Sequence, residues 1–166
     1  MKRKAVIASL TLLVVLATAL LSVGHILEHC TPGFYKNHTQ FFSGYSCFNF
    51  GPGTPVNTYF HATSSCVGNL TALQAISVPS SFCADASDKA LSQLNSGEII
   101  LLRQAITRIL NATNSNPISC DAVNPAINRI NTTVDEAITL DDKQPLIELA
   151  NRVALTNDDS VCTVGQ

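Results

Sequence analysis

Apolar and polar positions in the second half of the chain follow a helical pattern. Over residues 98–110, aliphatic side chains recur three and four positions apart, with arginine, glutamine and threonine between them. This spacing places the aliphatic side chains on one face of an α-helix. A shorter helix is predicted before it, over residues 84–94. It is expected to stop near Gly97, because glycine is favoured just beyond a helix C-terminus.

Two more helices are predicted towards the C-terminus. Asn124 and Pro125 suit an N-cap and a first turn, and aliphatic residues recur at helical spacing from there to residue 138. Asp141 and Asp142 precede the last apolar pattern, where carboxylates favour a helix N-terminus. No segment beyond residue 24 alternates like a strand over more than four residues. The pattern therefore predicts a mainly α fold, with three or four short helices packed beside an aromatic-rich, disulfide-stapled irregular N-terminal region.

The aromatic residues are distributed unevenly. Nine of the ten lie between Phe34 and Phe60, and only Phe82 lies outside this stretch. The same stretch is rich in glycine and proline, which predicts turns and short irregular pieces. The helical faces carry only Ala, Val, Ile and Leu, so we expect the rings to supply bulk to the core. A binding face is the alternative, although the chain has no tryptophan to serve as a carbohydrate platform.

The N-terminus is typical of an export signal. Three cationic residues within positions 1–4 precede a run of 19 residues, 5–23, with nothing more polar than serine or threonine. Residues 1–24 are predicted to be a signal peptide or an uncleaved membrane anchor, since small-residue cleavage patterns are present and the run is nearly long enough to span a bilayer. A pilin-like assembly helix is a third alternative, although the glutamate typical of bacterial pilins is absent.

Charge and cysteine usage narrow the class of protein. Beyond the leader, 7 basic residues stand against 12 acidic ones, without any basic run, so nucleic-acid binding is disfavoured. All six cysteines lie beyond the leader, and their even number in an oxidising compartment indicates disulfides. Six cysteines allow 15 pairings. We favour Cys30 with Cys162 and Cys66 with Cys83. The disulfide candidates are Cys30, Cys47, Cys66, Cys83, Cys120 and Cys162.

Motifs of known enzyme and metal sites are absent. The histidines and cysteines lack the close pairing of structural zinc ligands, so no metal and no cofactor is predicted. The sequence contains no nucleophile elbow, zinc-protease motif, P-loop or dinucleotide fingerprint. Asp135 and Glu136 would point in different directions on a helix, and Asp141-Asp142 is explained by capping. Four Asn-x-Ser/Thr sequons permit glycosylation, and the candidates are Asn37, Asn69, Asn111 and Asn131.

Residues 30–38, Cys-Thr-Pro-Gly-Phe-Tyr-Lys-Asn-His, form the most informative stretch. Its Pro-Gly pair predicts a tight turn, and the two rings after it can anchor that turn to the core. Asn37 and Gln40 have the spacing of a capping-box variant that opens a short helix. Lys36 and His38 have no such structural role, so we treat them, together with Tyr35, as candidate binding residues.

The same stretch resembles a motif, C-T-x-G-[YF]-W-K-N-H, that follows the leader in uncharacterised secreted proteins, mostly bacterial. The sequence at 109–114 and the cysteine at Cys162 are similar to features of these proteins as well. The usual tryptophan is Tyr35 here. The resemblance implies export and a shared fold, and it implies no catalytic residue.

These observations predict one extracytoplasmic domain over residues 25–166, with a Cys/aromatic loop region over 25–83 and a helical region over 84–166. Its expected function is that of a non-enzymatic secreted or cell-surface structural or interaction module, with a cell-surface protein or a second copy as partner. The alternatives are a subunit of an extracellular filament or coat and a small hydrolase that uses His38 with a carboxylate. An acid about 3 Å from His38 in an open cleft would favour the hydrolase, and packing against rings would disfavour it.

Overall fold

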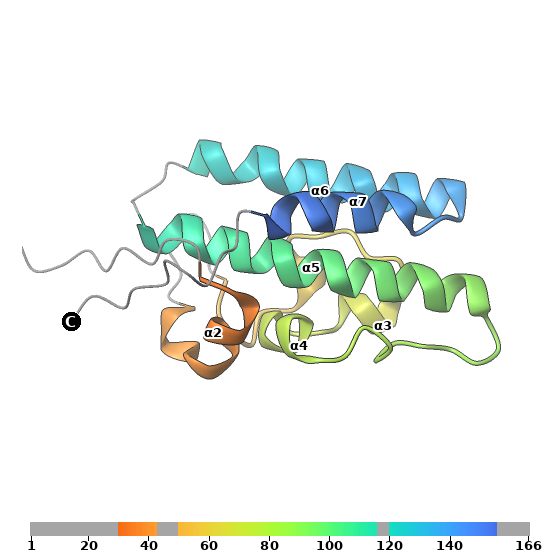
Figure 1. Ribbon diagram of the computed structural model, residues 1–166, viewed down its shortest axis with the longest axis horizontal. Helices are drawn as coiled ribbons and strands as arrows, with labels where there is room; N and C mark the ends of the chain where they lie inside the picture. Colours follow the sequence, from red (N-terminus) through yellow and green to blue (C-terminus); the bar gives the residue numbers. More distant parts are fainter. Residues whose placement is uncertain (1–29, 43–49, 116–119, 156–166) are drawn as a thin grey trace, which may run out of the picture.

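The computed structural model describes residues 30–42, 50–115 and 120–155, and this part of the chain is helical and without strands. The long helix α5 runs through the middle, with α6 and α7 on one side and the short helices α2, α3 and α4 on the other (Figure 1). The helices are α2 (Pro32–Asn37), α3 (Ser65–Gly68), α4 (Ala72–Ser77), α5 (Lys89–Ser115), α6 (Cys120–Leu140) and α7 (Gln144–Ala154), with 3-10 turns η1 (Thr39–Phe41) and η2 (Val56–Thr58). The prediction of a mainly α fold is confirmed.

Helix α5 is one continuous helix of 27 residues, so the prediction of two short helices separated at Gly97 was wrong. Gly97 is buried inside α5. A Cβ atom on it would lie 3.1 Å from the Cβ of Lys143 and 3.2 Å from Cδ1 of Leu146. The glycine therefore allows the start of α7 to approach α5 closely. Helix packing, rather than a helix end, explains its place in the sequence.

Helix α6 also differs from its prediction, because it begins at Cys120 and contains Pro125 in its interior. A proline there removes one backbone hydrogen bond. Val123 and Ile127, on either side of it, are buried in the core, and their packing offsets this loss. The prediction for α7 is confirmed, since the side chain of Asp142 accepts a hydrogen bond of 2.9 Å from the backbone N–H of Gln144 in the first turn.

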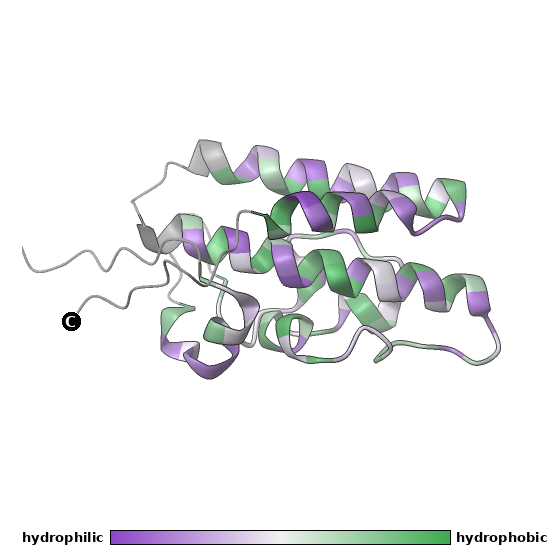
Figure 2. Cartoon of the chain, in the orientation of Figure 1, coloured by the Kyte–Doolittle hydropathy of each residue, from purple (hydrophilic) through white to green (hydrophobic). Residues whose placement is uncertain are grey.

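The core explains why α5 is central. Its buried residues point in nearly all directions around the helix, as expected for a helix covered on two sides. Helix α6 buries a single stripe, and hydrophobic and hydrophilic positions alternate along its ribbon in Figure 2. The stripe consists of Val123, Ile127, Ile130, Val134 and Ala137. Their spacing of three and four residues is the amphipathic pattern that the sequence indicates.

The aromatic residues that the structure describes between Phe34 and Phe60 pack into or against the core. Tyr35 lies edge-on to Phe34, with ring centroids 5.3 Å apart, and Phe50 lies edge-on to Phe60 at 6.1 Å. The expected core role is thus confirmed for these rings. Phe82 is exposed. Tyr45 and Phe48 lie outside the described residues.

One disulfide joins Cys66 of α3 to Cys83 in the segment before α5, with a Cα–Cα distance of 5.8 Å. This confirms the predicted pairing. Cys30 is disulfide-bonded as well, but the proposed Cys30–Cys162 pair includes a cysteine outside the described residues. The predicted leader, 1–24, also lies outside them. Among the described helices, none combines the length and apolar character that crossing a membrane requires.

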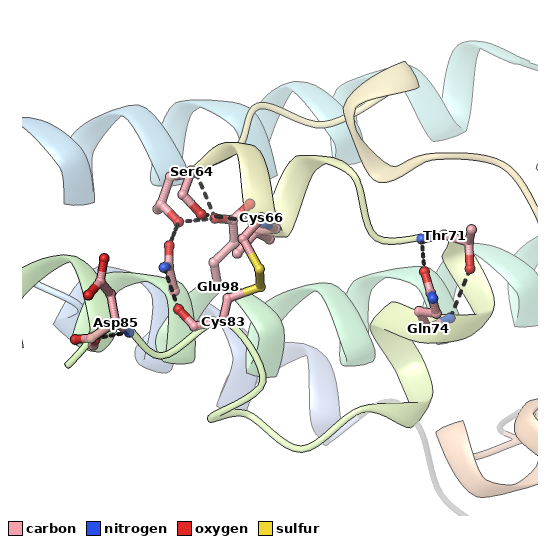
Figure 3. The surroundings of a disulfide bond; sticks show 11 residues. Ser64, Cys66, Thr71, Gln74, Cys83, Asp85 and Glu98 are labelled. Atoms are coloured by element: carbon pink, nitrogen blue, oxygen red, sulfur yellow. Dashed lines mark hydrogen bonds between the residues drawn. A yellow bond between two sulfur atoms is a disulfide. The ribbon is translucent and has the colours of Figure 1, made fainter. Parts of the chain in front are cut away.

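Helix α4 begins with a reciprocal capping box. The hydroxyl of Thr71 accepts from the backbone N–H of Gln74 at 3.2 Å, and the side chain of Gln74 accepts from the backbone N–H of Thr71 at 2.8 Å (Figure 3). We expect Thr71→Ala to lower the free energy of unfolding by about 1 kcal/mol. Urea unfolding measures the loss, and Thr71→Ser should retain most of the stability. An unchanged midpoint for Thr71→Ala would contradict this role.

Candidate functional site

The 30–38 stretch folds differently from its local prediction. Its Pro-Gly pair opens helix α2 instead of forming a tight turn. The capping box of Asn37 and Gln40 was wrong, because Asn37 is the last residue of α2 and its side-chain amide donates back to the carbonyl of Gly33 at 3.0 Å. The next turn has His38 at its N-cap position, without a side-chain cap bond. Of the candidate binding residues, Tyr35 is buried and Lys36 is exposed.

His38 packs against aromatic rings. Its ring stacks on Phe34 with centroids 4.4 Å apart, and Phe41 lies 6.3 Å away. Its Nδ1 atom is 2.9 Å from the backbone carbonyl of Phe34. Within the described part of the chain, no carboxylate is hydrogen-bonded to this histidine. This is the geometry expected of a folding element, and it offers no support for a hydrolase that uses His38.

Asn111 receives the 30–38 stretch in the core. Its side-chain oxygen accepts from the hydroxyl of Tyr35 at 2.9 Å and from the backbone N–H of Cys30 at 3.0 Å. Its amide nitrogen donates to the carbonyl of Cys30 at 2.8 Å. Only 1% of Asn111 is exposed, so a glycan on this buried amide is incompatible with the folded structure. The signal in the sequence is an asparagine that interrupts the apolar face of α5.

The other sequon asparagines occupy different environments. Asn131 is partly buried, donates to the carbonyl of Tyr59 at 3.2 Å and accepts from the backbone N–H of His61 at 2.9 Å. Asn37 and Asn69 are exposed. Accessible sequon asparagines in the folded protein are therefore Asn37 and Asn69, and Asn37 already uses its amide within α2.

His61 and Asp135 form a hydrogen-bonded pair that the sequence pattern does not reveal. Nδ1 of His61 lies 2.9 Å from a carboxylate oxygen of Asp135, and both side chains are 57% exposed. The pair links the segment before α3 to α6. In enzymes with a serine nucleophile, a carboxylate holds the histidine in position beside that nucleophile. Neither His61 nor Asp135 lines the two surface hollows beside α6 and α7. An exposed pair of this kind contributes about 0–1 kcal/mol to stability.

Glu98 is a fully buried acid beside the Cys66–Cys83 disulfide (Figure 3). Its Oε2 accepts from the backbone N–H of Thr63 at 2.7 Å and lies 2.5 Å from the Thr63 hydroxyl. That hydroxyl is also 2.7 Å from the side-chain oxygen of Asn95. Burial raises the pKa of Glu98 to about 7, although the hydrogen bonds from Thr63 act in the opposite direction.

The hydrogen bonds around Thr63 are best satisfied when Glu98 is neutral. A hydroxyl has one proton, so it cannot donate to both Glu98 and Asn95. A protonated Glu98 donates to the Thr63 oxygen, and Thr63 then donates to Asn95. Within the described residues, Oε1 of Glu98 has no hydrogen-bond partner, which adds to the cost of its charged form. Because Glu98 is fully buried, it suits a structural role better than contact with a substrate.

A groove of about 450 Å³ opens among α5, α6 and α7. Its volume falls within the range of about 300–1,000 Å³ typical of small-molecule sites. Most of its surface is apolar. The apolar lining includes Ile109, Ala126, Ile130, Leu149 and Val153.

The unequal lengths of the three helices explain the groove. At 1.5 Å per residue, α5 is about 40 Å long and α7 only about 16 Å. Helix α7 packs extensively on α5 and also contacts α6. The last turn of α7, at Val153, lies at the groove. Helices α5 and α6 extend beyond this turn. Among the described residues, no side chain of α7 therefore covers the apolar strip between the ends of the two long helices.

Three arginines line this apolar groove, one from each helix: Arg108, Arg129 and Arg152. All three side chains are exposed. In the described segments, no carboxylate oxygen lies within 4 Å of any of their guanidinium nitrogens. Sequence reasoning did not single these residues out, because they are 21 and 23 positions apart and each reads as an ordinary polar position on an amphipathic helix.

Comparisons with known proteins add no assignment, since no family model, curated protein or solved structure matches the chain. No group of three or more His, Cys, Asp or Glu residues in the described ranges is arranged to hold a metal ion. The arginine-lined groove is therefore the candidate functional site.

Proposed function

We propose that the protein is an exported, non-enzymatic interaction module, secreted or held at the cell surface, that binds a small ligand with an apolar part in the groove among α5, α6 and α7. The observation that carries the proposal is an apolar hollow lined by three arginines that no carboxylate of the described chain pairs. A concave apolar surface with a few polar groups is typical of ligand sites. Leaving such a surface in water has a free-energy cost that a ligand removes.

Export is supported by three observations. The N-terminal sequence is typical of a leader, and Cys66 and Cys83 form a disulfide, which suits an oxidising compartment. The 30–38 stretch resembles a motif of secreted proteins, and here it serves as a packing element held by Asn111.

Filling the groove tests the proposal. Ala126 is exposed and lines the groove, so Ala126→Trp should occupy it. We expect the purified protein to enhance the fluorescence of Nile red, an uncharged dye that responds to apolar surroundings. Ala126→Trp should weaken this binding by at least about tenfold, the loss of about 1.4 kcal/mol of contact energy.

Asn128→Trp is the matched control. Asn128 is exposed on the same helix, about 200° around it from Ala126 at 100° per residue. It should leave dye binding unchanged, and circular dichroism should show both variants to be folded. Absence of binding by the parent protein, or equal binding by the two variants, would refute the groove as the binding site.

A further inference from the structure

We infer that the ligand of this groove is a free amphiphilic anion, a single apolar chain that ends in one carboxylate, sulfate or phosphate group. This inference rests on the proposed function and names the chemical class of its ligand. The charges around the groove carry it.

The groove concentrates positive charge in an acidic protein. Beyond the predicted leader, the chain has 7 basic and 12 acidic residues, and three of the basic ones line this hollow. They come from three helices, so no single helix pattern accounts for their convergence. A cluster of positive charge on a negatively charged protein attracts anionic ligands.

The donors of these arginines remain available. Within the described residues, their side chains make a single hydrogen bond, a long one of 3.4 Å from Nε of Arg152 to the backbone carbonyl of Glu148. A guanidinium has five N–H donors and matches an anion in a two-pronged geometry. Arg103 shows the contrast, because it is partly buried and donates to the carbonyl of Val78 at 2.6 Å.

A neighbouring polar hollow refines where the anionic group binds. It shares Arg129 and Arg152 with the groove and also contains Glu136, Asp142 and Glu148. These acids are farther than 4 Å from the guanidinium nitrogens, but they offset part of the positive potential there. Arg108 lines only the apolar groove. We therefore place the anionic head of the ligand nearest to Arg108.

The apolar lining excludes the simpler ligands. A small inorganic anion would pair with the arginines and leave the apolar surface in water. A plain hydrocarbon would cover that surface and leave the cations unpaired. An extended peptide would need backbone hydrogen-bond partners, whereas the lining residues belong to helices whose backbone groups bond within the helix. An apolar chain with one anionic end satisfies both the lining and the arginines.

Isothermal titration with three straight-chain probes tests the inference. Decanoate, decanol and decyltrimethylammonium carry straight alkyl chains of similar length and end in an anionic, a neutral and a cationic head group. We expect decanoate to bind at least about tenfold more tightly than decanol, since a charge-assisted hydrogen bond contributes this much or more. Binding of decanoate should weaken with added salt, and the cationic probe should bind more weakly than decanol.

Arg108→Gln should weaken decanoate binding about tenfold or more and leave decanol binding unchanged. Lys89→Gln is the control, because Lys89 is an exposed cation at the start of α5 and outside the groove. It should bind decanoate like the parent protein. If Arg108→Gln and Lys89→Gln had equal effects, general charge rather than this site would explain the preference, and the inference would fail.

Two further outcomes separate this inference from the proposed function. If decanol binds as tightly as decanoate and Ala126→Trp blocks both, the groove is a ligand site, but the inference that its ligand is an anion is wrong. If none of the probes binds, the proposed function fails together with the inference. In a remaining case, the protein binds phosphatidylglycerol vesicles through Arg108 and fails to bind free decanoate. That result would overturn the inference of a free ligand and indicate that the groove binds a membrane surface.

Discussion

Asn111→Ala is expected to lower the free energy of unfolding by about 3–5 kcal/mol, the largest loss of any single change considered. The substitution removes the buried acceptor for the hydroxyl of Tyr35 and the backbone N–H of Cys30, and the donor to the carbonyl of Cys30. Each buried polar group left without a partner costs about 1–3 kcal/mol. The effect reaches the whole 30–38 stretch, because these bonds hold it to α5.

Urea unfolding followed by circular dichroism measures the loss. Tyr35→Phe removes one hydroxyl and one of the three hydrogen bonds that join Asn111 to Tyr35 and Cys30, so it should cost only about 1 kcal/mol. Asn128→Ala, an exposed asparagine of α6, should change stability by less than about 0.5 kcal/mol. A loss below 1 kcal/mol for Asn111→Ala would show that Asn111 does not fasten the stretch.

The second large effect is a pH dependence of stability that arises from Glu98. Its pKa is about 7 in the folded protein and near the ordinary value of 4.5 in the unfolded chain. The folded protein therefore holds a proton that the unfolded chain releases between these values. The stabilisation is complete below about pH 4.5 and is lost as the pH rises through 7, at up to about 1.4 kcal/mol per pH unit. The total is about 3 kcal/mol.

Unfolding free energies of the oxidised protein between pH 4.5 and 8 test this effect against Glu98→Gln. The amide keeps the shape of the protonated acid and does not titrate, so the stability difference between the two proteins should shift by about 3 kcal/mol across this range. Glu148→Gln, an exposed acid of α7, is the matched control and should follow the parent curve. Parallel curves for the parent and Glu98→Gln would exclude Glu98 as the source.

No charged residue contributes to the shift, so the effect belongs to the buried cluster itself. His61 precedes Thr63 by two residues, and Lys143 lies against Gly97, the residue before Glu98. His61 is paired with Asp135. Both residues are present in the parent protein and in Glu98→Gln, so the difference between the two proteins reports Glu98 alone.

Much of the fold was predictable because its signals are local. Helical spacing located the aliphatic faces of α5, α6 and α7, and the clustering of rings predicted an aromatic contribution to the core. The lengths of α5 and α6 were not predictable in the same way. Gly97 and Pro125 are typical of helix boundaries, but contact with α7 and the burial of Val123 outweigh these local preferences. Tertiary packing routinely overrides propensities of this size.

The candidate site was less predictable than the fold. His38 and Lys36 attracted attention because they stand in a dense motif, yet the motif proved to be a packing element. The groove arginines lack any sequence motif. Their convergence depends on how three amphipathic helices are placed side by side, which no window of the sequence records.

The sequence by itself determined that this chain has a leader-like N-terminus, a mainly helical fold and a core with an aromatic part. These features follow from composition and periodicity, which are properties of neighbouring residues. The cysteine spacing left all 15 pairings open, and the structure decided for Cys66 with Cys83. Only the tertiary structure decided that Asn111 and Glu98 are buried and that Arg108, Arg129 and Arg152 share one groove. The burial of a side chain and the convergence of several side chains on one groove depend on contacts between residues far apart in the chain. The energies of these contacts arise only once the helices pack.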